Sequence, residues 1–152
     1  MHSSPVLLDT DTLSELCRGN ERVVDRARSY LKTHGRLTTT AVTVFERLRG
    51  YELAIQQGKP FDGQLQSFRG LAAACVVLPF DDEAAAVAAR IWGRAVQSLR
   101  QKLGDLLIAS VAISRQLPLV TRNRRDFEAL AEAGGFDLHL VDWTRAEARR
   151  SR

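Results

Sequence analysis

Hydrophobic residues along the chain fall into two kinds of segment, short continuous runs and longer stretches with helical spacing. The continuous or β-rich runs predict buried strands at about residues 5–8, 37–40, 75–78, 117–121 and 138–141. Helical spacing, bounded by capping residues, glycine or proline, predicts helices at about residues 10–18, 21–34, 42–57, 62–74, 81–103, 105–113 and 125–133. Because strands alternate with helices, the pattern predicts an α/β fold with a mostly parallel central sheet of about four to five strands and helices on both faces.

Length and composition fit one compact domain. The chain has 152 residues, of which 45% are hydrophobic, and it contains no repeat or linker. We expect a domain at residues 1–143 followed by a basic tail at residues 144–152. No apolar run approaches the roughly 20 residues of a membrane helix and the start lacks signal-peptide features, so we expect a cytoplasmic protein without a membrane association. The net charge of +4 suits a polyanionic partner but is a mild excess.

Acidic side chains follow the predicted strands, where ligands bind in open parallel sheets. Four carboxylates meet this condition: Asp9, Glu46, Asp105 and Asp126. Taken singly, each is explained as a helix cap or an exposed helix residue. If they converge, they repel one another unless a cation neutralises them, and an all-oxygen site suits Mg²⁺ or Mn²⁺. Such an ion can activate water and clamp phosphate, which indicates phosphodiester hydrolysis.

Four sequence blocks resemble the PIN-domain family and, within it, the VapC toxins of bacterial toxin–antitoxin pairs. The blocks are residues 6–16 (VLLDTDTLSEL), 39–50 (TTAVTVFERLRG), 105–110 (DLLIAS) and 119–127 (LVTRNRRDF). They occur in the family's order over almost the whole domain. The resemblance therefore implies a single PIN-like domain at residues 1–143.

The resemblance also implies a role for each site residue. Asp9, Glu46 and Asp105 would hold Mg²⁺ or Mn²⁺, and Asp126 would be the fourth acid. Two further residues, Thr121 and Asn123, would orient the site by hydrogen bonds, and either Asp126 or Asn123 would be the residue of the last block that reaches the metal. The implied activity is endonucleolytic cleavage of RNA, restrained by a VapB-type antitoxin, in a chain that forms homodimers.

Arginines near the motif acids are candidate RNA contacts. Arg122, Arg124 and Arg125 are the nearest to the last acid, with Arg122 favoured, and a solvated charged face is the alternative. Asp11, beside the first acid, is expected to cap the first helix, with support of the metal as the alternative.

Two departures from the family pattern concern the third acid. Residues 101–104 form a shorter approach to Asp105 that lacks the usual looser glycine and proline sequence, and Ser110-Val111 replaces a small-residue pair. Both departures bear on how Asp105 is held.

Two other functions compete with the nuclease. The residues 9–12 (DTDT) also resemble the nucleophile motif of haloacid-dehalogenase-type phosphatases, with Asp9 as nucleophile and Asp11 as acid/base. That family needs a lysine and a late acidic pair, whereas Lys102 lies only three residues before Asp105 and no second acid follows closely. The other alternative is a metal-free PIN-like module that binds RNA or protein without cutting.

Overall fold

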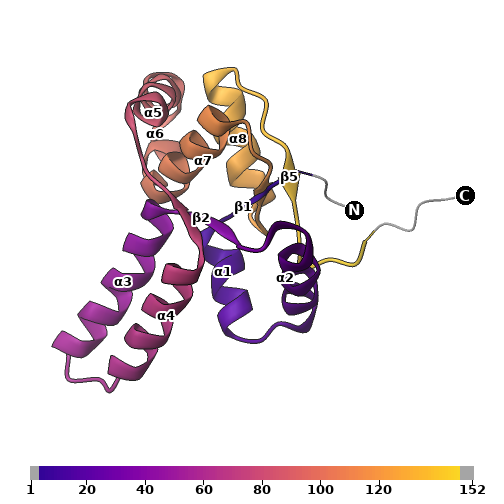
Figure 1. Ribbon diagram of the computed structural model, residues 1–152. Helices are drawn as coiled ribbons and strands as arrows, with labels where there is room; N and C mark the ends of the chain where they lie inside the picture. Colours follow the sequence, from indigo (N-terminus) through magenta and orange to yellow (C-terminus); the bar gives the residue numbers. More distant parts are fainter. Residues whose placement is uncertain (1–3, 148–152) are drawn as a thin grey trace, which may run out of the picture.

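The computed structural model describes residues 4–147 (Figure 1). Its strands are β1 (Leu7–Leu8), β2 (Thr38–Thr40), β3 (Val76–Leu78), β4 (Leu119–Val120) and β5 (Leu140–Val141). Its helices are α1 (Thr10–Cys17), α2 (Glu21–His34), α3 (Ala41–Gln56), α4 (Asp62–Ala74), α5 (Asp82–Arg94), α6 (Gln97–Arg100), α7 (Leu103–Arg115) and α8 (Arg124–Gly134). Strands and helices alternate, as the hydrophobic pattern predicts.

All strand pairs are parallel. One sheet has the order β1-β4-β5, with Leu7 opposite Leu119 and Leu119 opposite Leu140. The other pairs β2 with β3, with Thr38 opposite Val76. The two sheets meet where β2 lies beside β1, and the Thr39 hydroxyl donates a 3.0 Å hydrogen bond to a carbonyl oxygen of β1. The carboxyl ends of β1, β2 and β4 therefore reach one edge of the combined sheet.

Alternating residues of the short strands face two different layers of helices. Leu7 and Leu119 belong to a core that α5, α7 and α8 build on one face. Leu8 and Val120 belong to a second core, to which α1, α2 and α4 contribute. This period of two is what parallel strands buried on both faces require, and it confirms the expected α/β arrangement (Figure 1).

The helix predicted at residues 81–103 is wrong in its length. Helix α5 ends at Arg94, and the backbone is extended at Ala95 (ψ 147°) and Val96 (ψ 158°) before α6 begins. The alanine-rich sequence permits a longer helix, but α7 packs back against α5, so the chain must turn between them. Gly104 lies in the first turn of α7 and does not break a helix.

Two expectations concern the tail and the membrane. The last described residues are tied to the domain, since Arg26 pairs with Glu147 at 3.2 Å and Arg145 with Asp142 at 3.3 Å. The rest of the expected basic tail, residues 148–152, lies outside the described residues. Within the described chain, none of the helices combines the length and apolar character needed to cross a bilayer.

Candidate active site at the carboxyl edge of the sheet

Asp9 joins the end of β1 to the start of α1. Its backbone N–H donates to the Val120 carbonyl at 3.1 Å, which holds it at the ends of both central strands. Its side chain accepts a 2.7 Å hydrogen bond from the Thr12 N–H and caps α1. The residue is only 3% exposed. Asp9 therefore both caps a helix and presents a carboxylate at the sheet edge.

Glu46 reaches the same edge from α3. The Thr10 hydroxyl donates a 2.8 Å hydrogen bond to Glu46 Oε1, which links α1 to α3. On the other side lies Gly104, where an added Cβ would come within 2.5 Å of Glu46 Oε2. A glycine at this position therefore lets the carboxylate lie directly against the first turn of α7.

Asp105 and Asp126 share one amide. The Asn123 side chain donates to Asp105 Oδ2 at 3.3 Å and to Asp126 Oδ2 at 2.9 Å. The Thr121 hydroxyl accepts a 2.9 Å bond from the Asn123 backbone N–H, so the turn after β4 is fixed. The Lys102 ammonium forms a 2.9 Å ion pair with Asp126. Thus Asn123 bridges the third and fourth acids, and Lys102 neutralises the fourth.

The pKa of Asp105 shows that the four acids interact electrostatically. Burial is the largest cause that raises the pKa of the Asp105 carboxyl, which reaches about 6. Repulsion adds to this shift and comes from the carboxylates of Asp9, Glu46 and Asp126. Acids from four separate segments therefore act on one another.

The outer two acids are shifted in opposite directions. Burial raises the pKa of Asp9, and hydrogen bonds from Thr121 and Thr12 oppose that rise only in part. The pKa of Asp126 is lowered, first by the hydrogen bond from Lys102 and then by that from Asn123. The edge therefore has a buried end where negative charge is disfavoured and an outer end where it is stabilised.

The donor set fits a hard divalent cation. Carboxylate and amide oxygens are the ligands that Mg²⁺ and Mn²⁺ prefer, and the repulsion at Asp105 is what such an ion relieves. Among residues 4–147, no three His, Cys, Asp or Glu side chains lie close enough together to form a complete ligand cluster. The fit therefore rests on the chemistry of the donors and on their mutual repulsion.

Asp11 does not have the role that the sequence predicted, and it pairs with Arg122. Asp11 is not the cap of α1, because Asp9 fills that position. Instead Asp11 accepts two hydrogen bonds from Arg122, at 2.7 and 2.8 Å, and Glu15 lies 3.5 Å from the same guanidinium. This ion pair clamps α1 to the turn after β4 at the rim of the site.

The other two candidate arginines diverge. Arg124 turns toward the sheet and donates to the Leu140 carbonyl at 3.1 Å, with Glu128 at 3.5 Å. Arg125 is exposed and lines a cleft with Asp126. Of the two, only Arg125 faces the acidic side.

Three residues that support the site were not assigned a role from the sequence. They are Thr10, Lys102 and Gly104. Only Lys102 carried a signal, its place three residues before Asp105. The short approach at residues 101–104 is what brings the ammonium to Asp126 and the glycine to Glu46.

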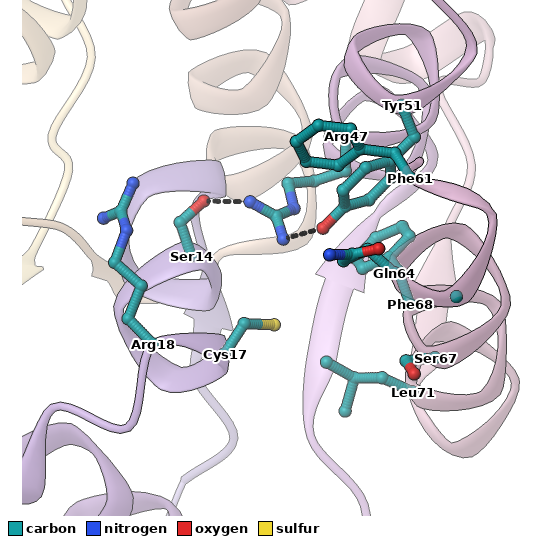
Figure 2. Close-up of a pocket in the computed structure, with 11 residues that line it drawn as sticks. Ser14, Cys17, Arg18, Arg47, Tyr51, Phe61, Gln64, Ser67, Phe68 and Leu71 are labelled. Atoms are coloured by element: carbon teal, nitrogen blue, oxygen red, sulfur yellow. Dashed lines mark hydrogen bonds between the residues drawn. The ribbon is translucent and has the colours of Figure 1, made fainter. Parts of the chain in front are cut away.

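A second concavity lies behind the acids, between α1, α3 and α4 (Figure 2). This groove has a volume of about 700 Å³ and a mainly apolar lining from Tyr51, Phe61 and Phe68. Arg47 lies across it, donating to the hydroxyls of Ser14 (2.9 Å) and Tyr51 (Figure 2). The Nε of this arginine is buried without a hydrogen-bond partner among the described residues.

Fold and site together define an α/β domain with a carboxylate-rich ligand site at the carboxyl edge of a parallel sheet. The model of one family, the PIN domain, matches residues 6–133. The chain therefore belongs to the PIN-domain family, whose members are in general nucleases that use divalent metal ions. This membership confirms the family expected from the sequence, and the chain is therefore not a member of the haloacid-dehalogenase-type phosphatases.

Solved toxin–antitoxin structures share the fold. DNA-bound VapBC from Salmonella typhimurium matches with 25% identity and a TM-score of 0.67, over 91% of this chain and 98% of that one. FitAcB from Neisseria gonorrhoeae matches with 26% identity and a TM-score of 0.65, over 91% and 97%. VapBC-1 from nontypeable Haemophilus influenzae matches in fold, with 20% identity and a TM-score of 0.70, over 93% and 100%. Among curated proteins, none matches in sequence.

Proposed function

We propose that this chain is an endoribonuclease of the VapC type that cleaves RNA with Mg²⁺ or Mn²⁺ and is restrained by a VapB-type antitoxin. The observation that carries the proposal is the repulsion of Asp105 by three other carboxylates at the sheet edge, which together with burial, the larger cause, raises its pKa to about 6. Structural relatives described as VapBC and FitAcB complexes support the toxin class. The net charge of +4 suits a polyanionic substrate.

Asp9, Glu46 and Asp105 would hold the cation, with Asp126 as the outer acid. The ion would supply a clamp for phosphate and lower the pKa of the attacking water. The chain's own residues position the carboxylates: Thr10 orients Glu46, and Asn123 bridges Asp105 and Asp126. Asp9 is fixed by its capping bond at the start of α1, Glu46 lies on α3 and Asp105 on α7, so three helices contribute acids to this edge of the sheet.

The groove between α1, α3 and α4 is the proposed docking surface for the antitoxin. Its aromatic lining would bury apolar side chains, and the Arg47 guanidinium that lines it would attract a carbonyl or carboxylate oxygen of the docked segment. Arg47 follows Glu46 on α3, so a segment in this groove would contact a helix that carries one of the acids. Occupation of the groove would therefore restrain the site.

A homodimer is the third part of the proposal. Large apolar side chains remain exposed on α3 and around α6, and they include Phe45 (60%), Leu53 (61%) and Val96 (65%). Scattered single exposures need no explanation, but Phe45 and Leu53 belong to one helix, α3, and Val96 lies in the connection between α5 and α7. We expect a second copy to cover part of these exposed side chains.

The deciding experiment is RNA cleavage by the purified chain. We expect cleavage of single-stranded RNA with Mg²⁺ or Mn²⁺, loss in chelator, and a fall of about a thousandfold on Asp9→Asn or Asp105→Asn. Thermal unfolding checks that both variants fold. Arg28→Gln, on the exposed face of α2, is the control and should leave the rate unchanged. Full cleavage by the folded Asp variants would contradict the assignment of the active site. RNA binding by the parent chain without any cleavage would support the alternative of a PIN-like module that binds RNA without cutting it.

A further inference from the structure

A cleft of about 650 Å³ opens beside Asp126, between α6 and α8. Its polar lining comes from Ser98, Lys102, Asn123, Arg125 and Asp126. Two of these are cations, so the cleft differs from the acidic edge that it adjoins. A chain of phosphates crossing the acids would meet positive charge here.

Lys102 sits at the boundary between the cleft and the acids. It is the residue before α7, and its side chain is 42% exposed. Its ammonium lies 2.9 Å from Asp126 Oδ2, the same oxygen that accepts the 2.9 Å bond from Asn123. In the cation-free chain, Asp126 Oδ2 therefore accepts hydrogen bonds from both the Lys102 ammonium and the Asn123 amide.

A divalent cation at the acids would change this arrangement. A carboxylate that shares its charge with a cation attracts an ammonium less, and the cation itself repels the ammonium. The flexible four-carbon stem of Lys102 allows the ammonium to move toward the cleft, where the exposed Arg125 lies. Lysine and arginine placed together in this way bind phosphate oxygens.

We propose that Lys102 and Arg125 form a phosphate subsite in this cleft, which binds an RNA phosphodiester next to the one that is cut. Lys102 neutralises Asp126 when no cation is bound and contacts RNA when the acids are loaded. This inference rests on the proposed function, because RNA is its ligand. It adds a residue, Lys102, that lies outside the four family motifs.

The test is RNA binding measured by fluorescence anisotropy with a labelled 12-nucleotide single strand, in the otherwise unchanged chain with Ca²⁺ in place of Mg²⁺ to load the acids, and with the strand checked on a gel to be intact. Lys102→Met should weaken binding about tenfold and reduce the slope of log affinity against log salt by about 0.7, the loss of one phosphate contact. Lys102→Arg keeps the charge and should restore both. The control Lys59→Met, at the exposed turn between α3 and α4, should change neither.

A second readout is Mg²⁺ binding by thermal shift in the otherwise unchanged chain. Lys102→Met should bind Mg²⁺ at an equal or lower concentration, because no ammonium competes for Asp126. Unchanged RNA affinity and salt slope in Lys102→Met would overturn the subsite. A Lys102-dependent stabilisation by inorganic phosphate with unchanged RNA affinity would also overturn it, in favour of a free-phosphate site. If the parent chain binds no RNA at all, the proposed function falls and the subsite with it.

Discussion

The acidic edge and the groove share two helices, α1 and α3, yet their chemistry is opposite. Helix α1 brings Asp9 to the edge and Ser14 to the groove, while α3 brings Glu46 to the edge and Arg47 to the groove. At the edge, like charges oppose one another and raise the pKa of Asp105. In the groove, aromatic rings surround one arginine whose Nε has no partner among the described residues.

Each region therefore calls for a different ligand. The edge is stabilised by positive charge, because a cation relieves the repulsion of its carboxylates. We expect the groove to be stabilised by an apolar segment that also offers an oxygen to the Arg47 guanidinium. Adjacent residues on a helix point about 100° apart, which is how Glu46 and Arg47 serve two surfaces at once. The Ser14–Arg47 hydrogen bond joins α1 to α3 between them.

A substitution that fills the groove should have the largest effect, because we expect it to weaken antitoxin binding and leave RNA cleavage at the acidic edge unchanged. Ser67 is exposed on α4 and lines the groove, so Ser67→Arg places a long side chain in it without disturbing the core. We expect the antitoxin, taken as the small protein encoded by the adjacent reading frame, to bind about a hundredfold more weakly. RNA cleavage by the free chain should stay unchanged, since no acid is touched. Co-purification and titration of inhibition measure the two effects.

The matched control is Gln66→Arg, which adds the same charge to the same helix one position away, outside the groove. It should bind the antitoxin normally. Equal loss of inhibition by both variants would show that added charge matters and not the groove. Normal inhibition of Ser67→Arg would place the antitoxin elsewhere on the molecule.

A smaller effect is expected at the edge from Gly104→Ala. The new Cβ would displace the Glu46 carboxylate, whose oxygen lies 2.5 Å from that position, and a flexible side chain can yield without unfolding the protein. Mg²⁺ affinity should fall about tenfold. Stability should hold or rise by up to about 1 kcal/mol, because alanine favours a helix over glycine. Thermal unfolding with and without Mg²⁺ measures both quantities.

Gly50→Ala is the control for this substitution. Gly50 lies in α3, the helix of Glu46, and a Cβ there meets no atom within 4 Å. It should gain the same helix stability and keep its Mg²⁺ affinity. An unchanged Mg²⁺ affinity in Gly104→Ala would mean that the Glu46 carboxylate is not needed for the cation.

The sequence predicted the edge better than the groove, for a physical reason. Parallel strands end at a common edge, so residues such as Asp9 that follow an apolar run can be placed from the pattern alone. The groove needs the packing of α1, α3 and α4, which no local pattern encodes. Arg47 had no visible partner in the sequence because Ser14 lies 33 positions away.

Errors at the edge have the same origin. Asp11 has the composition of a helix cap, but its partner Arg122 is 111 positions distant and only the fold brings them together. The prediction of one helix through Ala95 and Val96 was wrong because alanine occurs in both helical and extended backbone. The packing of α7 on α5 decides that the backbone is extended here. Local propensity thus placed the elements, while long-range contacts set their ends and the partners of their charged residues.

The smallest expected effect is a dependence of stability on pH that belongs to the edge alone. The folded pKa of Asp105 is about 6, above its ordinary value of 3.8, so its charge opposes folding at neutral pH. The contribution of the protonated Asp105 carboxyl to the free energy of unfolding is fully present below the unfolded pKa and is lost as pH rises through about 6. Asp105→Asn should therefore be more stable than the parent by about 1 kcal/mol at pH 7.5, a figure reduced for partial exposure, and the difference should shrink toward pH 5. Mg²⁺ should abolish this advantage by stabilising only the parent. Ser67→Arg, in the groove, should have the stability of the parent at every pH. Denaturant unfolding of the three proteins measures each difference, and an Asp105→Asn variant that is never more stable than the parent would show that repulsion among the four carboxylates does not destabilise the fold.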